Sequence, residues 1–177
     1  MEHIAYRPAA RIVLGTGLLL MIPLIAMQFA TGVNWTGSDF VVAGAMLIGA
    51  GTLFHFLSRK AGDRVHRAAA AVAVGTGLFL VWADLAVGIV SDGANIPNLL
   101  YLGVAAIEII GALLARFQPA GMTRALFVTA IAQAAVGLYA LTTGLDDVLH
   151  IVGINVMFIV LFVSAGALFQ SVANRSR

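Results

Sequence analysis

The chain has 177 residues, of which 61% are hydrophobic and 10% are charged, and its formal net charge is +2. Soluble domains average about 45–50% apolar and about 25% charged residues. The composition therefore excludes a soluble globular enzyme, a disordered segment and a nucleic-acid-binding module. Because the chain has no cysteine, it also excludes disulfides, thiolate metal sites and thiol catalysis.

Six apolar stretches are each close to the length that crosses a membrane, which takes about 20 residues of helix. Their residues are continuously apolar and do not alternate, so we predict helices and not barrel strands. The connections are short, so consecutive helices should form antiparallel hairpins. The sequence predicts an all-α integral membrane bundle of six transmembrane helices in one domain, 1–177, with an uncleaved first span. The predicted spans are 12–30, 40–57, 68–90, 99–115, 125–143 and 151–172.

The positive charges follow a simple pattern along the chain. If the six spans alternate, all ten Lys and Arg residues fall on one side of the membrane. Cytoplasmic loops carry the excess of positive charge, so we predict that both termini are cytoplasmic. These ten residues are Arg7, Arg11, Arg59, Lys60, Arg64, Arg67, Arg116, Arg124, Arg175 and Arg177.

The chain also resembles itself. Residues 14–20 read LGTGLLL and residues 74–80 read VGTGLFL, and at the same shift Gly51 lies over Gly111. The third hairpin fits more loosely, through GALF at 166–169 and GALL at 111–114. The pattern predicts three parallel repeats, and transporter sites often lie at repeat interfaces. The alternative is that glycine-rich apolar segments look alike by composition alone.

Two carboxyl side chains interrupt predicted spans, at a cost of roughly 2.5–3.5 kcal/mol each at a helix centre. Asp84 lies in LVWADLAVG of the third span and Glu108 lies in GVAAIEIIG of the fourth. Counting inward from the shared loop puts their depths about 5 Å apart, at about 1.5 Å per residue. Two neighbouring carboxyls do not both ionise easily, so the pair predicts a proton or cation site. Alternatively, each is a buried protonated acid bonded to a neighbouring helix, or lies in a wet crevice.

Other polar and aromatic residues give weaker signals. Gln133 and Asn155 are supporting polar candidates, although amides in spans more often join helices than bind cargo. Gly77 and Gly88 share a helix face with Asp84, which indicates that this face turns into the bundle. The histidines show no i, i+4 pairing, so we expect no transition-metal site. The sequence has no phosphate loop, Ser-His-Asp set or His-Glu-x-x-His motif, so we expect no cofactor and no catalytic residue. Three aromatic residues near span ends fit interfacial anchors: Trp35, Tyr101 and Tyr139.

The segment VNWTGSDFVVAGAMLIGAG at 33–51, together with LVWADLAVGIV at 80–90, resembles an uncharacterised family of small bacterial inner-membrane proteins. Members of that family are described as hypothetical membrane proteins. The resemblance implies a bacterial cytoplasmic membrane, and it implies no activity, cofactor or partner. The family often carries asparagine at the position of Asp84, so the resemblance does not imply an essential carboxylate there.

Two functions remain open from the sequence. The first is a small channel or ion-coupled transporter with a site at Asp84 and Glu108. The second is an accessory or structural membrane protein that binds another membrane complex or lipid. We expect no enzyme, because no catalytic constellation is present. The expected partners are anionic lipid headgroups at the basic inner loops and a homo-oligomer or larger membrane complex, with no nucleic acid.

Overall fold

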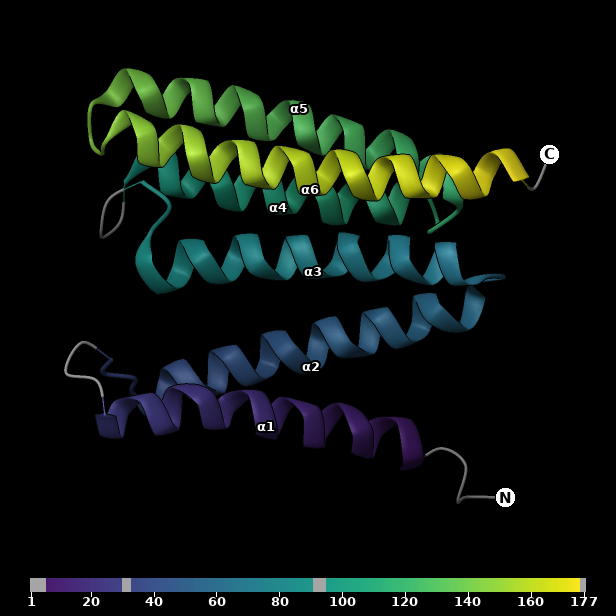
Figure 1. Ribbon diagram of the computed structural model, residues 1–177, viewed down its shortest axis with the longest axis horizontal. Helices are drawn as coiled ribbons and strands as arrows, with labels where there is room; N and C mark the ends of the chain where they lie inside the picture. The colour runs from purple at the N-terminus through teal and green to yellow at the C-terminus, as the bar shows by residue number, and fades with distance from the viewer. Residues whose placement is uncertain (1–5, 30–32, 91–94, 176–177) are drawn as a thin grey trace. The chain divides into compact units, whose positions relative to one another are not determined.

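The computed structural model describes residues 6–29, 33–90 and 95–175, and these residues form helices and connecting turns without any strand (Figure 1). Six helices within these ranges are long and apolar enough to cross a membrane. The prediction of an all-helical, multi-pass membrane protein is therefore confirmed. The helices are α1 Tyr6–Phe29, α2 Gly37–Lys60, α3 Arg64–Val87, α4 Ile96–Leu114, α5 Pro119–Thr143 and α6 Val148–Arg175.

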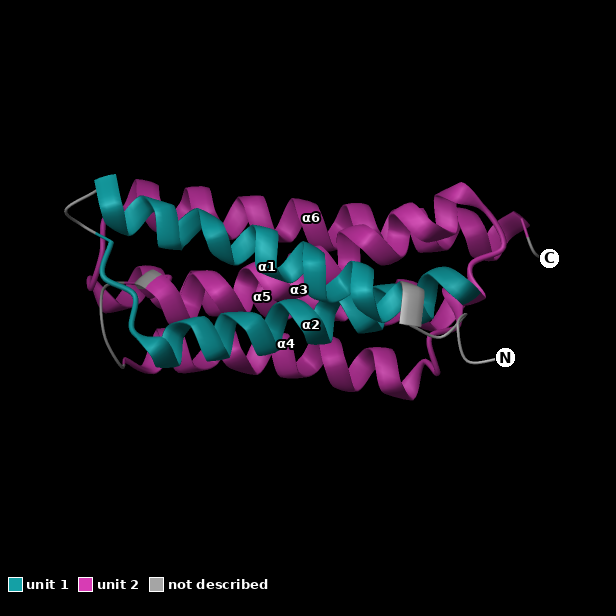
Figure 2. Cartoon of the chain, turned by 90° about the horizontal axis from the view of Figure 1, so that it is seen from below, with its two compact units in different colours: residues 1–59 teal, residues 60–177 magenta. Residues whose placement is uncertain are grey.

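The helices group into two compact units, residues 1–59 and residues 60–177 (Figure 2). The first predicted hairpin, α1 with α2, makes up the first unit. In it, a Cβ atom added to Gly51 would lie 3.0 Å from Cγ2 of Ile12, and one added to Gly44 would lie 3.5 Å from Cδ1 of Leu20. The contact at Gly44 is an ordinary van der Waals distance, whereas glycine at residue 51 lets the helices approach closely, as small residues do in lipid.

The second unit is a four-helix bundle in which each helix packs on two others. Helix α3 packs on α4 and α6, and α5 packs on α4 and α6. The second and third predicted hairpins therefore share one core. Large side chains fill this core and are at most 1% exposed: Leu80, Tyr101, Leu126, Phe158, Phe162 and Phe169. Leucines outside the core face outward, including Leu114 at 80% and Leu149 at 79% exposed, as lipid contact favours.

One end of the second unit collects its basic residues, and we call it the basic end. Two contacts there join the first and last helices of the bundle. Asp63, the N-cap of α3, accepts a hydrogen bond from the backbone N–H of His66 at 2.7 Å and lies 3.5 Å from Arg175 of α6. The His66 and Phe169 rings meet at a centroid distance of 5.6 Å. Because neighbouring helices run antiparallel, five arginines gather at this end: Arg64, Arg67, Arg116, Arg124 and Arg175.

The turn between α4 and α5 has an unusual backbone. Arg116 and Phe117 have φ values of +49° and +58°, in the left-handed region. The backbone N–H of Phe117 donates to the carbonyl of Ala112 at 3.1 Å, and that of Arg116 donates to the carbonyl of Leu113 at 2.9 Å. These two bonds form a Schellman motif, whose left-handed residue is usually glycine. Here an arginine occupies that position.

Candidate functional site

Glu108 lies at the interface of α3 and α4 and is 8% exposed. Its carboxyl group occupies the space in front of Gly77, where any Cβ atom would contact it. Within the described chain, neither a hydrogen bond nor an ion pair holds this carboxyl group. Glycine at residue 77 is therefore what makes room on α3 for an acidic side chain from α4.

Asp84 lies near the end of α3 and is also 8% exposed. Its backbone carbonyl accepts a hydrogen bond from the backbone N–H of Gly88 at 3.1 Å. The Oδ1 atom is buried and has no hydrogen-bond partner among the described residues. The backbone of Asp84 thus helps to end α3, while one oxygen of its carboxyl group is left without a partner in the described chain.

The two carboxyl groups lie on the same interface but at different depths. Gly77, which contacts Glu108, precedes Asp84 by two helical turns, or about 10 Å along the axis. This offset is about twice the value derived by counting inward from the loop. The count treats the ends of α3 and α4 as lying at one level, whereas α3 ends at its C-cap Gly88 and α4 begins after its N-cap Asn95. A site formed by both residues stays a prediction. At this offset the two carboxyl groups do not hydrogen-bond to each other directly.

A second group of buried polar side chains joins α4, α5 and α6. Asn155 donates through Nδ2 to the Tyr101 hydroxyl at 2.8 Å, and its Oδ1 accepts from Nε2 of Gln133 at 3.0 Å. The same Nδ2 atom donates to the carbonyl of Ile151 at 2.8 Å. Tyr101 and Gln133 are fully buried and Asn155 is 5% exposed. Both amides predicted as supporting residues therefore join helices in this structure.

Gly137 of α5 lets this cluster form. A Cβ atom added there would lie 2.5 Å from Cγ and Oδ1 of Asn155, so only glycine accommodates the amide. One atom of the cluster is left over. Oε1 of Gln133 is buried and accepts no hydrogen bond from any described residue. An unsatisfied buried acceptor costs about 1–3 kcal/mol, so a proton donor brought to this atom would be bound favourably.

Tyr101 is the residue that sequence reasoning placed wrongly. It is completely buried and is not an anchor at the membrane surface. Its hydroxyl is hydrogen-bonded to the side chain of Asn155, so it belongs to the amide cluster of α5 and α6. A usable signal was present in the sequence: Tyr101 precedes Glu108 by seven residues, which puts both on one face of α4.

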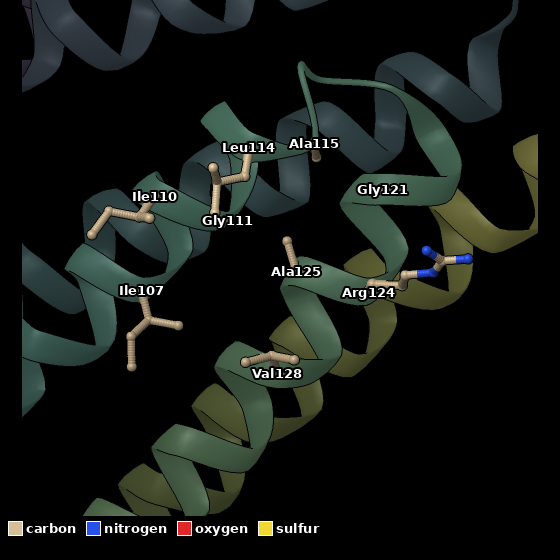
Figure 3. A pocket seen from close by; sticks show the side chains of 9 residues that line it. All are labelled: Ile107, Ile110, Gly111, Leu114, Ala115, Gly121, Arg124, Ala125 and Val128. Carbon is tan, nitrogen blue, oxygen red and sulfur yellow. The ribbon is translucent and has the colours of Figure 1, made fainter.

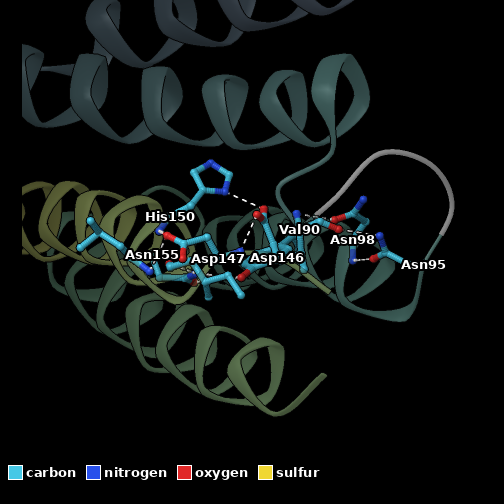
Figure 4. A network of polar contacts seen from close by, with 10 residues as sticks. Val90, Asn95, Asn98, Asp146, Asp147, His150 and Asn155 are labelled. Atoms are coloured by element: carbon cyan, nitrogen blue, oxygen red, sulfur yellow. Dashed lines mark hydrogen bonds and ion pairs between the residues drawn. The ribbon is translucent and has the colours of Figure 1, made fainter. Parts of the chain in front are cut away.

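The end of the bundle opposite the basic end is fixed by short-range polar contacts (Figure 4). The backbone N–H of Val90 donates to Oδ1 of Asn98 at 2.9 Å, and Nδ2 of Asn95 donates to the carbonyl of Val90 at 2.6 Å. Next to α6, His150 and Asp146 lie 2.6 Å apart. These contacts fix the ends of α3, α4 and α6. They therefore also fix the positions of Asp84, Tyr101 and Asn155 along the bundle axis.

A groove of about 440 Å³ lies between α4 and α5 near the basic end (Figure 3). Neither Asp84 nor Glu108 lines it. Its lining is apolar apart from one arginine side chain. The lining residues are Ile107, Ile110, Gly111, Leu114, Ala115, Gly121, Arg124, Ala125 and Val128.

No protein-family model, curated protein or solved structure matches the chain. In the ranges 6–29, 33–90 and 95–175, no three His, Cys, Asp or Glu side chains are grouped closely enough to hold a metal ion.

Proposed function

We propose that the protein is a small channel or ion-coupled transporter in which Glu108 binds the transported or coupling cation, a proton being the simplest case. The observation that carries this proposal is the placement of the Glu108 carboxyl group, which is buried against Gly77 and forms no ion pair with a Lys or Arg among the described residues. An ionisable group in a span is costly, and such groups usually mark ion paths or proton relays.

The polar side chains around the bundle core support a path toward Glu108. Asp84 and Tyr101 lie between Glu108 and the end of the bundle opposite the basic end. The Tyr101 hydroxyl is hydrogen-bonded to Asn155, which is in turn hydrogen-bonded to Gln133. In this proposal a proton enters near Asp84 and is taken up by Glu108.

The orientation and location of the protein belong to the same proposal. The basic end of the second unit faces the cytoplasm, as the positive-inside pattern favours. The resemblance noted above points to a bacterial inner membrane. Asp84 then lies toward the outer side, and the path to Glu108 opens from there.

The test is a flux measurement on the purified full chain in liposomes that contain a pH-sensitive dye. A pH step should give a counter-ion-dependent flux, and Glu108→Gln should abolish it while the protein stays folded, because glutamine matches a protonated glutamate in shape. Asp39→Asn is the control, since it removes an exposed carboxyl group and should leave the flux unchanged. Equal flux in wild type and Glu108→Gln liposomes would contradict the proposal.

The second candidate is an accessory membrane protein without transport. The observation that favours it is the aromatic filling of the core, where Tyr101, Phe158, Phe162 and Phe169 are at most 1% exposed. A bundle filled in this way suits a scaffold. Protein-free and protein-containing liposomes with the same flux would support this candidate, and co-purification of a stable membrane partner would identify its role.

A further inference from the structure

We propose that the groove between α4 and α5 binds one anionic phospholipid, with an acyl chain along the groove and the phosphate on Arg124. The proposal is independent of transport through Glu108, because neither buried carboxyl group lines the groove.

The groove has the shape of a chain-binding site. Its α4 wall runs from Ile107 to Ala115, about 12 Å along the helix axis. At its base the two helices are in close contact, since a Cβ atom added to Gly111 would lie 2.8 Å from Cβ of Ala125. Larger side chains rise on both sides, including Ile110 and Val128 at 56% and 55% exposed. Small residues at the base and branched residues at the rims leave a narrow apolar trough.

The one charged residue of the groove determines the direction in which the lipid lies. The stem of Arg124 lines the groove, and its guanidinium group extends beyond it, away from Ile107 (Figure 3). Arginine side chains near helix ends place their charge at the lipid headgroups and keep their stem on apolar surface. Arg116 lies in the adjacent turn and adds a second positive charge at this end. A phosphate bound there leaves its acyl chain directed along the trough toward Ile107.

The packing of the small residues favours a lipid over a helix from another protein. Gly111 already packs on Ala125, and Gly121 packs on Ala115. These small residues join α4 to α5 and do not form a free close-packing surface for another helix. The positive charge of Arg124 at one end matches the phosphate group of a phospholipid, and the apolar trough matches its acyl chain. A phosphate held on Arg124 should gain about fivefold in binding, the contribution of one basic residue near the membrane surface.

Native mass spectrometry of the purified full chain tests the proposal, with phosphatidylglycerol and phosphatidylcholine of identical palmitoyl and oleoyl chains as probes. We expect one retained phosphatidylglycerol and weaker retention of phosphatidylcholine. Arg124→Gln should lower the preference for phosphatidylglycerol about fivefold, and Arg124→Lys should preserve it. Val128→Trp, which fills the trough from its rim, should lower retention of both lipids. Glycerol phosphate alone should not displace the lipid.

Two control variants make the outcomes decisive. Arg67→Gln removes a charge from the same end but outside the groove, and Val160→Trp adds an indole to an exposed position on α6. Both should retain lipid as wild type does. The proposal is overturned if Arg67→Gln lowers the preference as much as Arg124→Gln, if Val128→Trp retains as much lipid as Val160→Trp, or if glycerol phosphate displaces the lipid.

Discussion

At the scale of single residues, glycines decide where polar side chains can lie inside the second unit. Gly77 faces the carboxyl group of Glu108, and Gly137 faces the amide of Asn155. In each case the polar group of one helix fills the space that a side chain on its neighbour would take. Both sites also put a costly polar group inside the bundle and away from lipid, which is where such groups usually lie in membrane proteins.

Gly77→Ala should destabilise the protein, because the new methyl group would occupy the position of the Glu108 carboxyl group. The expected loss is about 1–3 kcal/mol of unfolding free energy, which is typical of overpacking. Adding Glu108→Ala to Gly77→Ala should restore most of it. Thermal unfolding in detergent, followed by circular dichroism, measures the effect.

Gly75→Ala is the matched control for that substitution. It lies on the same helix, and an added Cβ atom there meets nothing within 4 Å. The change should be neutral, or stabilising by up to about 1 kcal/mol from helix propensity. Equal losses in the variants at residues 75 and 77 would show that Glu108 does not lie where we place it.

Much could be predicted from the sequence at this scale, because an ionisable side chain in a membrane span is stable in only a few environments. It predicted that Asp84 and Glu108 turn into the bundle, and both are buried. It could not place Tyr101, since a tyrosine near a span end is equally compatible with the membrane surface and with a buried hydroxyl partner. That partner, Asn155, is 54 residues away and is set by tertiary packing.

At the scale of elements, the turn after α4 shows how sequence and geometry can disagree. A Schellman motif with glycine would be recognisable from sequence, but residue 116 is arginine. The helices themselves were predictable because apolar runs of the right length have few other structures in lipid. Their ends were less so, and α6 extends through Arg175, past the apolar run that ends near residue 172.

Arg116→Gly should stabilise the turn. A left-handed residue other than glycine costs about 1–2 kcal/mol, and glycine removes this cost. Part of the gain is offset, because glycine makes the unfolded chain more flexible and so loses more entropy on folding. The net gain should be up to about 1 kcal/mol in unfolding free energy. Chemical denaturation in mixed micelles gives the number.

Arg116→Ala separates backbone strain from charge in that experiment. Alanine removes the guanidinium group but keeps the Cβ atom that makes the left-handed conformation costly. It should therefore give no gain. If alanine and glycine stabilise equally, repulsion among the arginines of the basic end is the cause instead.

At the scale of the whole molecule, the arrangement of charge is the most accessible property to test. The even number of spans and the collection of arginines at one end of the second unit agree with each other. Reporter fusions after Arg64 and after Arg177 should both report the cytoplasm, and a fusion within residues 92–96 should report the outside. Activity of an outside-specific reporter at Arg64 would contradict the six-span topology.

The bundle of the second unit closes through contact between its first and last helices, α3 and α6. This has a consequence for biosynthesis. Helix α3 is complete at Val87, but α6 is complete only at Arg175, about 90 residues later. At a synthesis rate of about 5–20 residues per second, α3 stays roughly 4–18 s in the membrane before α6, its second packing partner, is complete. During that interval the polar face of α3 that carries Asp84 has only part of its final surroundings. The insertion machinery, or α4 as the first partner, must shield that face until the ring is closed.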